Sequence, residues 1–117
     1  MTDSRRDRLA AAGATIVALL VYARTLAPTV LPGDSGEFQM AVPLLGLVHP
    51  TGYPLYLILG KLWLLLPLPG DAAGRVNLLS AVLSAVTVAL LYLLARRIGL
   101  ATVPSLLACL TLAFSQT

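Results

Sequence analysis

The chain has 117 residues, of which 58% are hydrophobic and 11% are charged. Soluble domains average about 45–50% apolar and about 25% charged residues, so this composition excludes a soluble globular protein. The net charge of +3 comes without a basic stripe interleaved with aromatic residues, which argues against nucleic-acid binding.

The first apolar run predicts a transmembrane helix over residues 9–27, long enough at about 1.5 Å per residue to cross a hydrocarbon core of about 30 Å. Arg5, Arg6 and Arg8 precede this run, and their positive charge predicts a cytoplasmic amino terminus. A cleaved signal peptide is the alternative, because it has the same pattern of basic residues before an apolar stretch. In both cases the residues that follow reach the outer side of the membrane.

The next segment, residues 28–77, contains seven of the eight prolines and seven of the nine glycines. These residues interrupt helices, so we expect an outer loop rather than a membrane span. Its best apolar run, Leu55–Leu66, is about twelve residues long and contains Lys61. A short run with a central charge predicts a helix that lies in the membrane interface.

Two further apolar runs predict transmembrane helices over residues 78–95 and 98–114, with Arg96 and Arg97 between them. An interfacial helix in the outer loop returns these arginines to the cytoplasmic face, as the positive-inside rule favours. We therefore predict an all-α integral membrane module over residues 1–117, with three transmembrane helices and an outer loop of interfacial helices after the first. The chain stops directly after an apolar run, so we expect it to be the front of a longer protein.

Two acidic residues of the outer loop, Asp34 and Glu37, lie in the segment L-P-G-D-S-G-E-F. Their spacing is that of a capping box, with Asp34 as the N-cap of a helix. Phe38, Val42 and Leu45 would then form one apolar face of that helix on the bilayer. A catalytic role is compatible with this interpretation, because a cap can hold a carboxylate in place.

The segment H-P-T-G-Y-P-L-Y contains His49, the only histidine. Its simplest interpretation is a turn, with Tyr53 and Tyr56 as anchors in the membrane interface. Asp34, Glu37 and His49 could together bind a metal ion, but their spacing is not diagnostic of one. No cofactor is predicted, and a divalent metal stays an open alternative.

The cationic residues of this region, Arg24, Lys61 and Arg75, have two interpretations. In the first they contact lipid headgroups or set the topology. In the second they bind a phosphate group, for which arginine and lysine are the usual donors.

Three sequence boxes in this order resemble the amino-terminal part of the transmembrane-protein-260-like family, which is related to the protein O-mannosyltransferases. They are T-L-A-P-T-V-L-P-G-D-S-G-E-F, H-P-T-G-Y-P-L-Y-L-I-L-G-K-L and G-R-V-N-L-L-S-A-V-L-S-A-V. The resemblance runs from about Thr25 to the end of the chain. One departure is Thr51, which stands where a second proline is common in the family.

The resemblance implies a GT-C fold and a membrane glycosyltransferase that transfers a mannose-like sugar with inversion. The donor would be linked to a polyprenyl phosphate, and the acceptor would be a hydroxyl of a protein or glycan. Asp34 matches the catalytic acidic residue of the outer loop, and Glu37 is second. The residues expected to bind substrate or phosphate are His49, Tyr53, Lys61 and Arg75.

The expected partners are the lipid-linked donor, the hydroxyl acceptor, membrane lipids and the remaining transmembrane helices of the full-length protein. The fragment is expected to be inactive by itself, and a bacterial inner membrane is favoured over the endoplasmic reticulum. A small non-catalytic membrane protein that packs against partner helices is the alternative function. A transporter is less favoured, because the polar residues predicted within the second span are only Ser80, Ser84 and Thr87.

Overall fold

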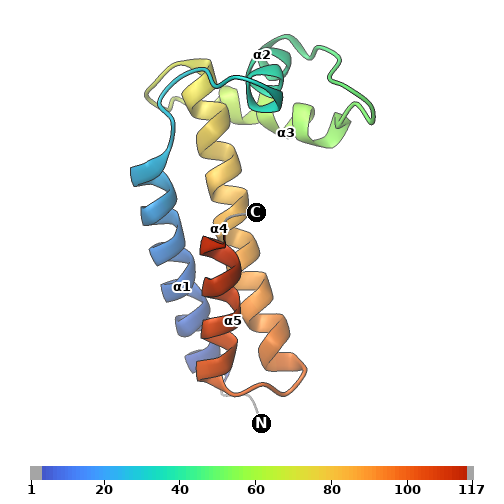
Figure 1. Ribbon diagram of the computed structural model, residues 1–117. Coiled ribbons are helices and arrows are strands. Elements are labelled where there is room, and N and C mark those ends of the chain that lie inside the picture. Colours follow the sequence, from blue (N-terminus) through green and yellow to red (C-terminus); the bar gives the residue numbers. More distant parts are fainter. Residues whose placement is uncertain (1–3, 116–117) are drawn as a thin grey trace. The chain divides into compact units, whose positions relative to one another are not determined.

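The computed structural model describes residues 4–115, which form five α-helices and no strand (Figure 1). The all-α prediction is therefore confirmed for the described part of the chain. The helices are α1 (Ser4–Thr25), α2 (Asp34–Leu44), α3 (Pro54–Leu64), α4 (Ala72–Arg97) and α5 (Thr102–Phe114). The chain divides into two compact units. The membrane unit comprises Met1–Arg24 and Ala81–Thr117, and the loop unit comprises Thr25–Ser80.

Two of the described helices, α1 over Arg5–Thr25 and α4, are long and apolar enough to cross a membrane. Only 17% of the apolar window of α1 and 33% of that of α4 are buried, whereas the core helix of a soluble protein is mostly buried. Large apolar side chains such as Ile16 and Leu90 are more than half exposed. Exposed apolar surface on long helices is stable in lipid rather than in water.

Both spanning helices begin earlier than the apolar runs predicted. The first starts at Ser4, five residues before Leu9, and α4 starts at Ala72, six residues before Leu78. At the start of α4, the carboxylate of Asp71 accepts a hydrogen bond of 2.7 Å from the backbone N–H of Gly74. Asp71 is therefore the N-cap of α4. The first residues of the helix include polar ones, so a prediction based on apolar runs starts the helix too late.

The third predicted span, residues 98–114, corresponds to the shorter helix α5 of 13 residues. The chain turns first at Gly99, whose φ of 100° is in the left-handed region that favours glycine. A 13-residue helix is about 20 Å long, which is less than the hydrocarbon core of about 30 Å. As described, α5 is therefore too short to cross a membrane.

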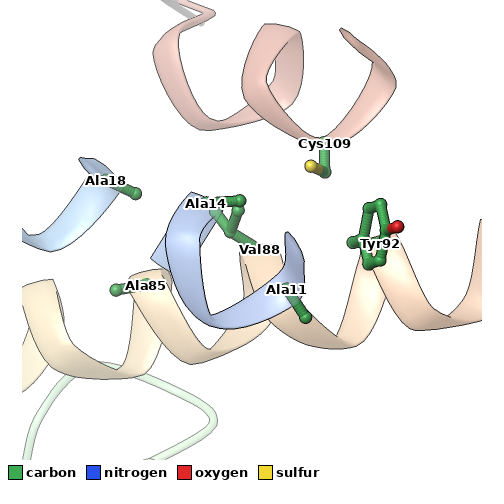
Figure 2. Close-up of a cluster of buried hydrophobic side chains, with 7 residues drawn as sticks. All are labelled: Ala11, Ala14, Ala18, Ala85, Val88, Tyr92 and Cys109. Atoms are coloured by element: carbon green, nitrogen blue, oxygen red, sulfur yellow. The ribbon is translucent and has the colours of Figure 1, made fainter. Parts of the chain in front are cut away.

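The core of the membrane unit is built mainly from small residues, where α1, α4 and α5 pack side by side (Figure 2). Small side chains let helix backbones approach closely, which is the usual way that helices associate in a membrane. The helix α1 contributes three buried residues to this core, all of them alanines. The core residues are Ala11, Ala14, Ala18, Ala85, Val88, Tyr92 and Cys109.

A polar contact joins the beginning of α1 to the end of α4. The carboxylate of Asp7, which is 5% exposed, accepts hydrogen bonds from Arg96 Nε at 2.7 Å and from the Tyr92 hydroxyl at 3.2 Å. The basic residues in the first turns of α1 and those at the end of α4 therefore lie at the same end of the membrane unit. This arrangement agrees with the prediction that they share one face of the membrane.

In the loop unit, α2 and α3 pack against each other around Val42, which is fully buried. A Cβ atom added to Gly60 of α3 would lie 2.7 Å from Val42 Cγ1, so glycine permits this close approach. The prediction that Phe38, Val42 and Leu45 form one face on the bilayer is wrong. Val42 is buried in the core and the half-buried Phe38 packs against it, because α3 covers that face of α2, whereas Leu45 is exposed.

The apolar helix predicted over Leu55–Leu66 is found as α3, whose 11 residues are too few to span a membrane. Several of its large side chains, among them Leu55 and Leu62, are more than half exposed. Its placement in the membrane interface stays a prediction.

Candidate functional site

The site is organised by the first turn of α2, which begins at Asp34. The N-cap is Gly33, with a φ of 71°, and no side chain caps the helix. The predicted capping box is therefore wrong. Glu37 donates its backbone N–H to the carbonyl of Gly33, while its carboxylate bonds to another segment of the chain.

That segment is the loop after α2, which the side chain of Glu37 holds at two points. Glu37 Oε1 accepts a hydrogen bond of 2.7 Å from the backbone N–H of His49. Glu37 Oε2 lies 2.6 Å from His49 Nδ1. The hydrogen bond to the His49 ring lowers the pKa of Glu37, and the bond to Glu37 raises the pKa of His49. The negative charge of Asp34 also raises the pKa of His49.

An aromatic cluster surrounds this pair. The ring of Phe38 packs edge-on against His49, Tyr53 and Tyr56, with centroid distances of 6.0, 5.1 and 5.3 Å. The hydroxyl of Tyr56 lies 2.7 Å from Ser80 Oγ, which ties α3 to the first part of α4. Tyr53 and Tyr56 thus take part in packing within the loop unit.

Beside these rings lies a cavity of about 390 Å³, here called the Asp34 cavity. It combines apolar and aromatic walls with a few polar groups, as small-molecule sites usually do. Of the residues that line it, Asp34 is the only carboxylate, and it is exposed. The lining residues are Asp34, Ser35, Phe38, Tyr53, Tyr56, Val76, Asn77 and Ser80.

Three potential metal ligands meet next to this cavity. One ligand atom from each of Asp34, Glu37 and His49 lies within 4.8 Å of the others. Two carboxylates and an imidazole are a donor set that suits Mn²⁺ or Zn²⁺. Both carboxylate oxygens of Glu37, however, already bond to His49. A metal ion would have to displace or share these bonds, so the geometry fits a hydrogen-bonded pair better than a preformed metal centre.

The two cations of the loop unit that were expected to bind phosphate make backbone contacts elsewhere. Lys61 Nζ donates to the carbonyl of Pro43 at 2.5 Å, which links α3 to α2. Arg75 Nη2 donates to the carbonyl of Leu64 at 2.6 Å and to that of Leu66. Arg75 Nε is buried without a hydrogen-bond partner among the described residues. Neither cation lines the Asp34 cavity.

A polar network that no sequence pattern singled out reaches the cavity at Asn77. The amide of Gln39, which is 4% exposed, accepts from the N–H of Leu31 at 2.8 Å and donates to Asn77 Oδ1 at 2.6 Å. Asn77 Nδ2 in turn donates to the carbonyl of Ala27 at 2.8 Å. The available signal was the presence of an amide side chain inside each of two helices, Gln39 in α2 and Asn77 in α4.

The described residues thus define a helical membrane protein that holds a carboxylate beside an aromatic cavity, in the segment between two long apolar helices. Comparison with known proteins identifies the group within this class. Residues 34–117 match the family model of the Protein O-mannosyl-transferase TMEM260 N-terminal domain, and the chain belongs to this family.

Two relatives show how much of a larger protein the chain corresponds to. It is 38% identical over 96 residues to the mouse Protein O-mannosyl-transferase TMEM260, a match that covers 82% of this chain and 14% of that protein. It is 29% identical over 77 residues to the Dictyostelium discoideum protein of the same name. That match covers 63% of this chain and 9% of that protein. The chain therefore spans a small part of the length of these relatives. No solved structure matches the chain.

Proposed function

We propose that the chain is the amino-terminal part of a membrane glycosyltransferase that moves a mannose-like sugar from a polyprenyl-phosphate-linked donor to a hydroxyl acceptor. The observation that carries this proposal is the carboxylate of Asp34 at an aromatic cavity of about 390 Å³. The names of the matched relatives, which describe O-mannosyl transfer, support the choice of sugar and acceptor.

In the proposed reaction, Asp34 acts as the general base. It accepts the proton of the acceptor hydroxyl while that oxygen attacks the anomeric carbon of the donor. The bond between the anomeric carbon and the phosphate oxygen breaks, and the lipid phosphate leaves with the electron pair. One displacement of this kind inverts the anomeric carbon, as in inverting glycosidases. The phosphate is a good leaving group, so no second carboxyl has to act as an acid.

The walls of the cavity suit an acceptor or a sugar. Phe38, Tyr53 and Tyr56 offer aromatic surface, while Asn77 and Ser80 offer an amide and a hydroxyl that can orient a polar group. In this proposal the rings exclude water from the reacting hydroxyl, and the polar groups set its direction toward Asp34.

Glu37 and His49 are proposed as positioning residues. Their double contact fixes the loop after α2 against the helix that carries Asp34. One ligand atom from each of Asp34, Glu37 and His49 lies within 4.8 Å of the others, so this contact also keeps His49 next to Asp34. If the enzyme uses a divalent metal, Asp34, Glu37 and His49 are the residues that would hold it.

The departing phosphate requires positive charge, for which Lys61 and Arg75 are the proposed sources. Each uses only part of its donor capacity in the bonds to Pro43, Leu64 and Leu66. Such charges stabilise the leaving group as negative charge develops on it.

The proposed topology places the amino terminus in the cytoplasm and residues 28–77 on the outer side, as one membrane module of GT-C type. The contact between Asp7 and Arg96 brings the basic ends of α1 and α4 together, and the positive-inside rule would then put both on the cytoplasmic face. A third span in the region of α5 is part of the same proposal.

The decisive experiment replaces Asp34 by asparagine in the full-length protein. Transfer of labelled mannose from a polyprenyl-phosphate donor to a peptide acceptor is measured in membranes, and folding is followed by the melting temperature. Loss of the base is expected to lower the rate by about 10²–10⁴-fold without changing the melting temperature. Asp71→Asn is the matched control, because asparagine retains the oxygen that caps α4 and its rate should stay near that of the wild type.

Two results would contradict the proposal. A wild-type rate in the Asp34→Asn variant removes Asp34 as the base. A wild-type protein that transfers no mannose from this donor, although folded and supplied with acceptor, favours the alternative of a protein that only packs against partner helices.

A further inference from the structure

The membrane unit contains a second concave site, which has no part in the proposed transfer reaction. It is a groove of about 530 Å³, here called the arginine groove. Residues from the first turns of α1 and the last turns of α4 line it. They are Asp7, Arg8, Leu90, Leu93, Leu94, Arg96 and Arg97.

The groove carries an excess of positive charge. Its lining contains three arginines but one carboxylate, that of Asp7. Asp7 is 8% exposed at its side chain and bonds to Arg96, so this pair is committed to holding α1 against α4. Arg8 and Arg97 also line the groove, and both are exposed. They come from different helices and place two guanidinium groups around one groove.

The other wall of the groove is apolar and open. Leu90 and Leu94 are 61% and 56% exposed, and both lie within the helix that is long and apolar enough to cross a membrane. Leu90, Leu94 and Arg97 follow at spacings of four and three residues, so they share one face of α4. Hydrocarbon surface thus leads along the helix directly to the guanidinium groups.

We propose that the arginine groove binds one anionic phospholipid, with its phosphate on Arg8 and Arg97 and an acyl chain along Leu90 and Leu94. Guanidinium groups form forked, charge-assisted hydrogen bonds with phosphate oxygens. Basic pockets at the ends of transmembrane helices on the cytoplasmic side recognise anionic headgroups in this way. A lipid is the occupant rather than free phosphate, because only a lipid uses the exposed leucines that continue the groove.

The test measures lipid binding to the full-length protein after it has been purified and stripped of lipid. Phosphatidylglycerol and phosphatidylcholine with identical acyl chains are added in turn, and bound copies are resolved by native mass spectrometry. One phosphatidylglycerol is expected to bind in preference to phosphatidylcholine. Arg97→Gln should weaken that binding by about fivefold, the effect of one basic residue near an anionic lipid.

The matched control is Arg5→Gln, which removes the same charge from an exposed position in the first turn of α1. Arg5 does not line the groove, so its replacement should leave the affinity nearly unchanged. Melting temperatures show whether each variant is folded. The Asp7–Arg96 contact is untouched in both variants, which keeps the helices packed.

Three results would overturn the proposal. Equal losses from Arg5→Gln and Arg97→Gln would show a diffuse attraction to basic residues rather than a site. Equal binding of the two lipids would remove the role of charge. Displacement of the lipid by millimolar inorganic phosphate would show that the headgroup alone occupies the groove and that the leucines contribute nothing. None of these measurements depends on sugar transfer, so the glycosyltransferase proposal stands or fails separately.

Discussion

The two units of the chain are held together by different means. The membrane unit packs alanine, valine and other apolar side chains between long helices, and its main buried polar contact joins Asp7 to Arg96 near the helix ends. The loop unit has a smaller apolar core around Val42 and adds side-chain hydrogen bonds to backbone and to other side chains, as at Gln39 and Arg75.

This difference follows from helix length. Long helices satisfy most of their own backbone groups, so close packing of small residues is enough to join them in lipid. The helices α2 and α3 have 11 residues each and are separated by turns rich in proline and glycine. Turns leave backbone groups without helical partners, and side chains supply the missing bonds. A site whose carboxylate must be held in place therefore belongs to the loop unit.

The largest expected effect on stability comes from replacing Gln39 by leucine. The N–H of Leu31 and the side chain of Asn77 would each lose a hydrogen-bond partner, and leucine cannot replace either bond. Two unsatisfied groups cost about 2–4 kcal/mol of the free energy of unfolding. The midpoint of denaturant unfolding of the purified protein measures it, with Met40→Leu at the exposed neighbouring position as the control.

A loss below about 1 kcal/mol in the free energy of unfolding of Gln39→Leu would contradict the comparison of the two units. It would mean that the polar network contributes little to the stability of the loop unit. The same variant should also reduce sugar transfer in the proposed enzyme, because Asn77 lines the Asp34 cavity. If the Gln39→Leu variant is fully folded and transfers sugar at the wild-type rate, the polar network does not contribute to the function of the Asp34 cavity.

A smaller loss is expected from Ala18→Leu in the membrane unit. Ala18 is fully buried in the core, where three added carbon atoms have to push the neighbouring helices apart. Overpacking of this kind costs about 1–3 kcal/mol. Val17→Leu, whose side chain is 49% exposed on the same helix, is the control and should change the unfolding midpoint little. Equal midpoints for the two variants would argue against close packing of α1 in this unit.

The sequence predicts the two units unequally well. Apolar runs located α1 and α4, because hydrophobicity over about 20 residues is set by the bilayer itself. The helix boundaries were missed where polar residues extend a helix, as at Asp71, which caps α4. The short α5 was predicted too long, because apolar residues before it continue through the turn at Gly99.

The loop unit was predicted in its parts but not in its arrangement. The sequence singled out Asp34, Glu37 and His49, and the structure brings the three together. It did not reveal that Glu37 pairs with His49 instead of capping α2, since this pairing depends on the path of a loop across 12 residues. Local spacing predicts local contacts such as a capping box, whereas a contact made through a turn depends on tertiary packing.

The smallest expected effect concerns the pH dependence of the Glu37–His49 pair. The pKa of Glu37 is lowered from 4.5, so its contribution to stability is present above pH 4.5 and is lost as the pH falls through the lowered pKa. The pKa of His49 is raised from 6.5, so its contribution is complete below pH 6.5 and is lost as the pH rises through the raised pKa. The pair therefore contributes most between these two values.

Glu37→Gln tests this assignment directly, because it removes the charge that raises the pKa of His49 while keeping an oxygen that can accept the His49 N–H. Titration of the His49 ring by NMR, with the signal assigned from a His49→Asn variant, should show its pKa falling toward 6.5. Burial lowers the pKa of His49 by more than the charge of Asp34 raises it, so no upward shift should persist in Glu37→Gln. A His49 pKa that does not change in Glu37→Gln would mean that the pair is not formed in solution. The loop after α2 would then need another attachment to hold it beside Asp34.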